Sequence, residues 1–184
     1  MLLQYETQRL ILKVLGPDYS SDVLRFYLKD RDLFEQYEAD RSLNFYTEGH
    51  QRTILQLEYG LTLKLAQVRF YVFLKENPEM IIGTVCLYDI SNSYSRANIG
   101  YKFSSAFHHK GYATEAVEKL LDIAVSELGL HRICAHVQES NTPSIRLLTG
   151  FGFEQEGICR DYLCLNGIWT DHLQYSLIAP TLHL

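Results

Sequence analysis

The sequence predicts a mixed α/β fold built from layers of strands and helices. Strand-like runs of apolar residues lie on both sides of one strongly amphipathic segment, Ala113 to Leu128. Two further runs flank Asn166-Gly167, the dipeptide most typical of a tight β-hairpin. The 184 residues contain no internal repeat, low-complexity tract or linker, so we expect a single domain over residues 1–184.

Two helices and a hairpin are expected in the first half of the chain. Ser20-Ser21-Asp22 is a helix start signal before an apolar segment, and a second apolar segment covers about residues 49–67. Between them, residues 30–48 mix acidic and aromatic side chains without a clear period. Turn residues at 76–79 separate two strand-like runs and predict the hairpin. The strands expected here are Arg9 to Val14, Phe70 to Leu74 and Met80 to Tyr88.

The second half predicts a strand at Arg96 to Phe103, followed by helix, strand, helix and hairpin. The amphipathic helix places apolar residues at i, i+3, i+4 and i+7, and Gly129 follows it where a left-handed residue commonly ends a helix. A strand over residues 131–138 comes next. A short helix then starts at Asn141-Thr142-Pro143 and ends near Gly150.

Composition and charge exclude several classes of function. The formal net charge of -5 argues against a nucleic-acid partner, which would favour a basic face. No apolar run approaches the ~18 residues that span a membrane. Residues 1–13 lack the apolar core of a signal peptide. We therefore expect a cytoplasmic protein with neither a membrane nor a nucleic-acid partner.

The cysteines and histidines predict no metal centre. None of the four cysteines forms a C-x-x-C pair with another, so we expect free, reduced thiols packed as small apolar side chains. His131 and His136 are separated by an odd number of positions on one expected strand, so they face opposite sides of it. We assign both histidines structural or surface roles.

The segment His108 to Ala116 is the best candidate for binding chemistry. It joins an expected strand to the amphipathic helix, and a helix N-terminus presents free backbone N–H groups and partial positive charge to an anion. Gly111 lets the backbone approach a phosphate without a Cβ in the way. Lys110 and the histidines at 108 and 109 add positive charge. The alternative is an ordinary strand-to-helix loop.

The run Lys110-Gly111-Tyr112-Ala113-Thr114-Glu115-Ala116 resembles the acetyl-CoA pyrophosphate loop of GNAT acetyltransferases, Q/R-x-x-G-x-G/A. It is especially similar to the ribosomal-protein (alanine) N-acetyltransferase branch. Three further segments resemble that branch, in the same order along the chain. They are Glu6 to Leu12, Asn141-Thr142-Pro143-Ser144 with Gly152-Phe153, and Arg160 to Tyr175.

This resemblance implies a fold and a cofactor. The fold would be a mixed, mostly antiparallel sheet with helices on both faces and a splay between the central strands. Acetyl-CoA would enter the splay, where its pantetheine arm satisfies backbone groups that lack a strand partner. By the resemblance, Phe103, Ser104 and Ser105 line the arm on one side, and Asn141 and Ser144 on the other. The residues implied to hold the pyrophosphate are His108, His109, Lys110, Gly111, Tyr112, Ala113 and Thr114.

The chain departs from the family pattern at three positions. His108 occupies the Q/R position, Leu148 stands where many relatives have a thiolate-protonating tyrosine, and Asn98 stands where some have an acid. The resemblance makes Ser144 our candidate general acid, with a plain helix-start hydroxyl as the alternative. Glu139, at the strand end beside the splay, is our candidate base through water, with a solvated loop carboxylate as the alternative.

The implied reaction is acetyl transfer from acetyl-CoA to a primary amine. A terminal α-amine is about 10–20% neutral at pH 7, against about 0.04% for a lysine-like amine, so a site without a strong base suits an α-amine better. We therefore favour a protein N-terminus as the acceptor. Polyamines, aminoglycosides, a CoA-binding module without turnover and a homodimeric assembly remain open.

The acceptor site is expected between residues 30–48 and the Asn166-Gly167 hairpin, because the cofactor motifs occupy residues 96–153. Glu35, Glu38 and Tyr37 are the candidate substrate-binding residues, since carboxylates beside aromatic side chains suit a cationic amine. Changing both glutamates to Gln is expected to weaken acceptor binding and to leave stability almost unchanged. A solvated acidic face is the alternative.

Overall fold

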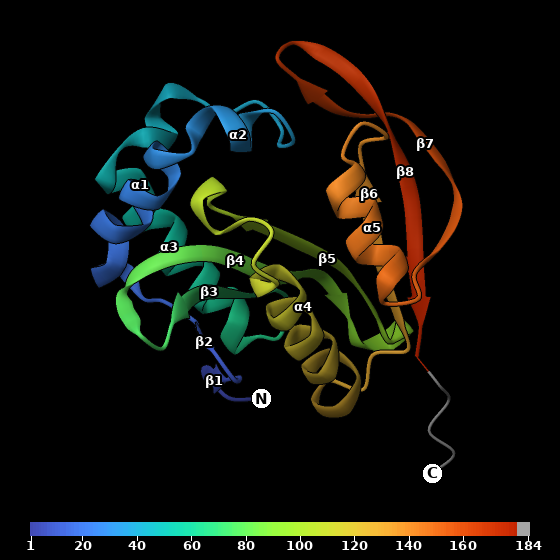
Figure 1. The fold of residues 1–184 in the computed structure, drawn as a ribbon, viewed down its shortest axis with the longest axis horizontal. Coiled ribbons are helices and arrows are strands. Elements are labelled where there is room, and N and C mark those ends of the chain that lie inside the picture. The colour runs from blue at the N-terminus through green and yellow to red at the C-terminus, as the bar shows by residue number, and fades with distance from the viewer. Residues whose placement is uncertain (180–184) are drawn as a thin grey trace.

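Eight strands form one sheet, in the order β1-β2-β3-β4-β5-β6-β8-β7, in a computed structural model that describes residues 1–179 (Figure 1). Residues 180–184, the end of the predicted domain, lie outside the described residues. Neighbouring strands are antiparallel except β5 and β6, which run parallel. The strands are β1 (Gln4–Glu6), β2 (Leu10–Lys13), β3 (Val68–Leu74), β4 (Asn77–Ser91), β5 (Arg96–Phe103), β6 (Arg132–Val137), β7 (Glu154–Leu165) and β8 (Ile168–Ile178).

Within residues 1–179 the expected order of elements is confirmed, with two short additions, β1 and α2. The amphipathic helix ends at Asp122 and continues as a π-helical turn over Ile123–Glu127, before Gly129 at φ +63°. No helix in this part of the chain is long and apolar enough to cross a membrane. The α-helices are α1 (Ser20–Lys29), α2 (Arg31–Glu35), α3 (Glu48–Leu63), α4 (Tyr112–Asp122) and α5 (Thr142–Gly150), and the 3-10 turns are η1 (Pro17–Tyr19), η2 (Leu43–Tyr46), η3 (Asn92–Tyr94) and η4 (Ser105–Phe107).

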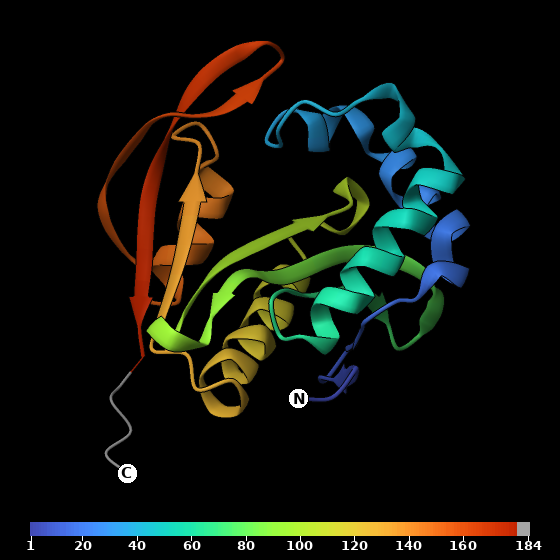
Figure 2. The same cartoon turned by 180° about the vertical axis from the view of Figure 1, so that it is seen from behind.

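Helices cover both faces of the sheet, as predicted. The larger hydrophobic core lies under α4 and α5, and a smaller core lies under α1, α2 and α3. Strand β3 supplies both cores in alternation, because Phe70 and Val72 point to the first and Tyr71 and Phe73 to the second. In Figure 1 α4 lies in front of the sheet, and in the reversed view of Figure 2 α3 lies in front.

The predicted splay lies between β5 and β6. Their parallel pairing joins Arg96 to Arg132, Ala97 to Ile133 and Asn98 to Cys134, and goes no further along the described residues. Beyond Asn98, β5 continues to Phe103 beside β4, and β6 continues to Val137 beside β8. Figure 2 shows the two strands starting together and diverging. Each strand therefore has one edge without a strand partner over its second half.

Asp40 ties the early segment to the tip of the C-terminal hairpin. Asn166 and Gly167 form the β7–β8 turn with φ of +51° and +76°, left-handed values that favour Asn and Gly. The Asp40 carboxylate accepts the backbone N–H of Asn166 at 2.5 Å and that of Gly167 at 2.9 Å. The two segments predicted to frame the acceptor site therefore meet, at the top of Figure 1.

Candidate functional site

The loop between β5 and α4 has the geometry of an anion site. Gly111 precedes the helix in a left-handed conformation, with φ of +77°. The first backbone bond of α4 runs from the N–H of Glu115 to the Gly111 carbonyl oxygen, at 3.1 Å. The N–H groups of Tyr112, Ala113 and Thr114 therefore have no backbone acceptor among the described residues. Free N–H groups at this end of an eleven-residue helix fit the pyrophosphate of acetyl-CoA.

Arg9 braces this loop from the first strands, a contact that the sequence did not predict. Its Nη1 donates to the Lys110 carbonyl oxygen at 3.0 Å, and its Nε lies 2.6 Å from Oε2 of Glu115. The Thr7 hydroxyl and the Arg9 backbone N–H donate to the other oxygen of Glu115, at 2.6 and 2.7 Å. A Cβ on Gly111 would lie 3.4 Å from Arg9 Nη2, so the left-handed backbone at φ +77°, and not a lack of space, is what favours glycine here.

The start of the loop is fixed by two further hydrogen bonds. His108 Nε2 lies 2.9 Å from the Phe103 carbonyl oxygen, so one ring nitrogen of His108 is used inside the loop. The Asp30 carboxylate accepts the backbone N–H of Ser105 at 3.1 Å and its hydroxyl at 2.5 Å. Ser104 between them is buried. Of the predicted cofactor residues, Phe103, Ser104, Ser105 and His108 thus lie in one hydrogen-bonded turn beside the splay.

Across the splay, α5 presents Asn141 and Ser144. The Asn141 side chain caps α5 by accepting the Ser144 backbone N–H at 3.3 Å. The Ser144 hydroxyl lies 2.8 Å from the Tyr101 hydroxyl, and the Tyr101 hydroxyl also donates to the Ser144 carbonyl oxygen at 3.3 Å. Burial raises the pKa of Tyr101 to about 12, so this phenol is protonated at neutral pH. Leu148, at the position where the resemblance places a tyrosine in many relatives, is a buried core residue, and the hydroxyl groups that meet at this end of the splay are those of Ser144 and Tyr101.

Glu139 lies at the end of β6, on an open depression of about 470 Å³ between the strand end and β8. Its neighbours there are Gln138, Ser140, Thr170 and Asp171. Glu139 is exposed and has no side-chain hydrogen bond or ion pair among the described residues. The position therefore leaves its carboxylate available to a bound molecule.

The face of the sheet opposite α4 and α5 carries polar groups next to the splay. Asn98 donates from Nδ2 to the Asp89 carboxylate at 3.1 Å, so an acid that β5 lacks is supplied by β4. The His136 ring on β6 stacks on Tyr162 of β7, with ring centroids 4.4 Å apart and an interplanar angle of 17°. Sequence reasoning assigned His136 a structural or surface role because it has no second ligand at metal spacing, and strand alternation alone does not show which face borders the splay.

The three candidate acceptor residues lie on the α2 side of the molecule. Glu35 accepts a hydrogen bond from Arg31 Nε at 2.9 Å and from the Tyr46 hydroxyl at 2.6 Å. Tyr37 is half-buried. The third, Glu38, forms ion pairs with both Arg41 and Lys102.

Lys102 of β5 contacts this acidic segment through its ion pair with Glu38. Its side chain is largely enclosed, and burial lowers its pKa to about 8. Its Nζ also lies 4.8 Å from the ring centroid of Tyr27, an aromatic contact that suits a cation. Glu38 is therefore the internal counter-ion of a buried lysine, a role that the sequence did not indicate.

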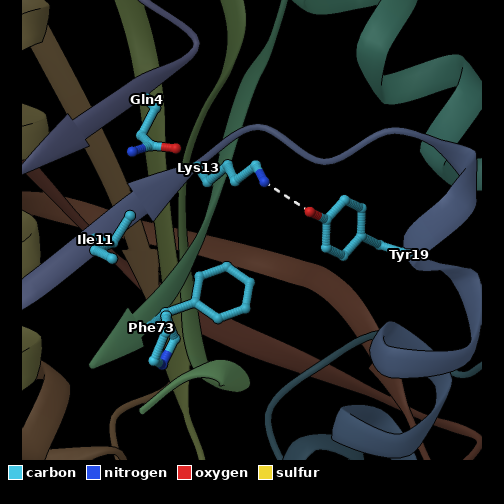
Figure 3. Close-up of a pocket in the computed structure, with 6 residues that line it drawn as sticks. Gln4, Ile11, Lys13, Tyr19 and Phe73 are labelled. Atoms are coloured by element: carbon cyan, nitrogen blue, oxygen red, sulfur yellow. Dashed lines mark hydrogen bonds between the residues drawn. The ribbon is translucent and has the colours of Figure 1, made fainter. Parts of the chain in front are cut away.

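A separate cavity of about 150 Å³ lies at the other end of the sheet, between β1, β2 and β3 (Figure 3). Lys13 Nζ donates to the Tyr19 hydroxyl at 2.6 Å across it. Two strands, β3 and β4, separate β2 from the splayed strand β5, so this cavity is not part of the loop and splay described above.

Comparisons with known proteins agree with this geometry. A family model described as an acetyltransferase (GNAT) domain matches residues 9–154. "Probable N-acetyltransferase YjcK" of Bacillus subtilis is 38% identical over 154 residues, which cover 83% of this chain and 84% of that protein. The structure of ribosomal-protein-S5-alanine acetyltransferase from Vibrio fischeri aligns with a TM-score of 0.90 at 26% identity, over 96% of this chain and 97% of that one. Mycobacterium smegmatis RimJ in complex with CoA-disulfide aligns with a TM-score of 0.87 at 25% identity, over 95% and 84%.

Proposed function

This chain belongs to the GNAT acetyltransferases and uses acetyl-CoA, and from that premise we propose that its acceptor is the α-amine of a protein N-terminus. The observation that carries the proposal is the likeness to the Vibrio fischeri ribosomal-protein-S5-alanine acetyltransferase over 96% of the chain. That protein is named for an alanine of ribosomal protein S5, which makes a protein the acceptor class that we infer for this chain. The proposed compartment is the cytoplasm.

The charges around the α2 segment favour a singly charged acceptor over a polyamine. Glu35 and Glu38 already bind Arg31, Arg41 and Lys102. A polycation would have to compete with these internal partners for each carboxylate. A peptide N-terminus brings one ammonium group and a backbone that forms neutral hydrogen bonds, so it disturbs fewer ion pairs.

The proposed cofactor placement follows the loop and the splay. The pyrophosphate binds the free N–H groups at the start of α4, and Lys110 supplies positive charge. The pantetheine arm lies between Phe103–Ser105 and the Asn141–Ser144 turn. Bound there, acetyl-CoA supplies the activated thioester, and the backbone of the splay holds it.

The proposed acid is Ser144, whose hydroxyl forms a hydrogen bond with the Tyr101 hydroxyl. A phenol that stays protonated can donate to the Ser144 oxygen, which frees the serine proton for a thiolate on the pantetheine side. The proposed base is Glu139, acting through water from the depression at the end of β6. Both roles rest on position and hydrogen-bonding capacity.

Acetyl-CoA consumption across matched amines tests the acceptor. The panel contains peptides with a free N-terminus, the same peptides with a blocked N-terminus and one free lysine, spermidine, and an aminoglycoside. We expect turnover with the free N-termini and little with the blocked ones. Faster turnover with spermidine or the aminoglycoside would replace the protein N-terminus with a small-molecule acceptor.

A further inference from the structure

Two polar side chains at the end of β6, beyond its pairing with β5, have hydrogen-bonding capacity that the described residues do not use. Nδ1 of His136 and Oε1 of Gln138 are both buried and have no partner among residues 1–179. The two residues are two positions apart, so they share one face of the strand. The opposite face, with Ala135 and Val137, is packed into the larger core. His136 and Gln138 thus face the side away from α4 and α5.

Leaving such groups without a hydrogen-bond partner is unfavourable in free energy. A buried donor or acceptor without a partner costs about 1–3 kcal/mol, so most buried polar atoms in folded proteins have one. Here both lie just past Cys134, where β6 loses its pairing with β5. Gln138 also lines the depression that holds Glu139. Position and unused capacity together indicate a surface that is completed by a bound molecule.

The surroundings hold the His136 ring in place and neutral. Tyr162 stacks on one side of it, and the His172 ring lies 5.3 Å beyond the Tyr162 ring. Burial, and then the neighbouring His172, lower the pKa of His136 below its ordinary value. A neutral imidazole at pH 7 has an unprotonated nitrogen ready to take a proton.

The titratable groups facing this ring come from four strands. His172 lies on β8 and, after burial, lowers the pKa of His136 further. The remaining groups act on Tyr162, and they are Tyr88 and Asp89 of β4, Cys134 of β6 and Cys159 of β7.

We propose that His136 takes the first proton, the one that the bound ammonium must lose before acetyl transfer, while Glu139 keeps its proposed role for the second, and that Gln138 positions the acceptor by a hydrogen bond to its Oε1. The inference rests on the proposed amine acetylation. The bound ammonium gives one proton to the unprotonated ring nitrogen of His136, and the neutral nitrogen then forms a bond to the thioester carbonyl carbon as the carbon–sulfur bond breaks. The second proton leaves the nitrogen through water toward Glu139, and the thiolate takes a proton from Ser144. His136 and Glu139 release their protons to solvent, and Ser144 regains its proton from solvent.

The test is the pH dependence of kcat/KM in His136→Gln, with His131→Gln as the matched control. His131 is exposed at the start of the same segment and has no side-chain bond among the described residues, so the same change there should leave turnover at the wild-type level. We expect kcat/KM of His136→Gln to fall about 100-fold at pH 7, as for loss of a general base. Acetyl-CoA affinity, measured by calorimetry, should stay within twofold.

The shape of the pH profile separates a proton acceptor from a packing residue. With His136 present, bound ammonium can be deprotonated in place, so kcat/KM should be nearly level across neutral pH. Without it the amine must arrive neutral, so kcat/KM should rise about tenfold per pH unit while the amine is mostly protonated. His136→Asn provides a second variant if the glutamine change prevents folding.

Two other outcomes overturn the inference in distinguishable ways. A variant profile parallel to that of the wild type removes His136 as the proton acceptor and leaves the proposed function standing. A wild-type chain that acetylates none of the amines in the panel removes the proposed function and this inference with it.

Discussion

The hydroxyl groups of Tyr101 and Ser144 meet across the splay at 2.8 Å, one from β5 and the other from α5. The two residues are 43 positions apart in the sequence, on the two walls between which the cofactor arm is proposed to lie. The pair joins a phenol that stays protonated to a serine at a helix start. In the proposed mechanism this pair supplies the proton donor, at a site where Leu148 stands in place of the tyrosine of many relatives.

Replacing Ser144 with Ala should lower kcat about 100-fold and leave KM for acetyl-CoA nearly unchanged, because the lost proton donor acts when the thiolate leaves. Tyr101→Phe should lower kcat by a smaller factor, since Ser144 keeps its own proton. Ser126→Ala, at the exposed far end of the helical segment, is the control and should behave as wild type. A change confined to KM would make Ser144 a cofactor contact and nothing more.

Gly111→Ala should weaken CoA binding more than it destabilises the fold. A left-handed residue with a Cβ costs about 1–2 kcal/mol, and the new Cβ would also contact Arg9 beside the proposed pyrophosphate site. Gly129→Ala is the matched control, because Gly129 has φ of +63° and open space around it. Thermal unfolding should show a similar loss for both variants, and calorimetry with CoA should show weaker binding for Gly111→Ala alone. Gly111→Trp should abolish binding while circular dichroism stays native. Equal CoA affinities in both alanine variants would show that the pyrophosphate does not bind at this loop.

Glu115→Gln should remove part of the acid sensitivity of the fold. Burial raises the pKa of Glu115, but hydrogen bonds from Thr7 and Arg9 outweigh it and hold the pKa below its usual value. Because the folded-state pKa is the lower one, the carboxylate stabilises the fold above its unfolded pKa of about 4.3, and this contribution is lost as pH falls through the folded value.

The measurement is the free energy of unfolding in urea from pH 7 to pH 3. Glu115→Gln should cost about 2 kcal/mol at pH 7 and progressively less toward pH 3. Glu118→Gln, an exposed change on the same helix, should track the wild type throughout. A pH-independent loss in Glu115→Gln would mean that shape, and not charge, braces the loop.

The double change Glu35→Gln with Glu38→Gln should raise the acceptor KM and leave acetyl-CoA binding unchanged. The sequence-based expectation that stability would barely move is wrong, because Glu38 is the counter-ion of the buried Lys102 and of Arg41. Leaving those cations unpaired should cost about 3 kcal/mol. The control is Glu76→Gln with Glu79→Gln, two exposed carboxylates in the β3–β4 turn and at the start of β4. A lower free energy of unfolding together with unchanged acceptor kinetics would mean that Glu35 and Glu38 have a purely structural role.

Local sequence patterns predicted the helices and strands well. They did not predict the contacts between segments that are far apart in the sequence. Strand β5 has the predicted bounds, because its residues and the loop after it carry their own signals. The Asp40 bond to Gly167 spans 127 positions, and no periodicity links two such segments. The continuous apolar run in β3 likewise concealed that the strand feeds two different cores.

The candidate site divides in the same way. The β5–α4 loop was predictable from one contiguous motif, and the likeness to relatives supplied the splay. His136 was assigned a minor role because strand alternation places it on a face without saying what borders that face. Only the loss of pairing after Asn98 and Cys134 shows that this face lies at an interruption of the sheet.

That interruption also bears on the behaviour of the chain in concentrated solution. A strand edge with free N–H and C=O groups is a template for a strand from another chain, and proteins usually protect such edges. The second halves of β5 and β6 are two such edges inside one sheet. A ligand with amide groups that lies between them would be a substrate, and it would also cover these edges so that they cannot pair with a strand of another chain. Purified chain kept with CoA should therefore self-associate more slowly in light scattering than the same chain without it.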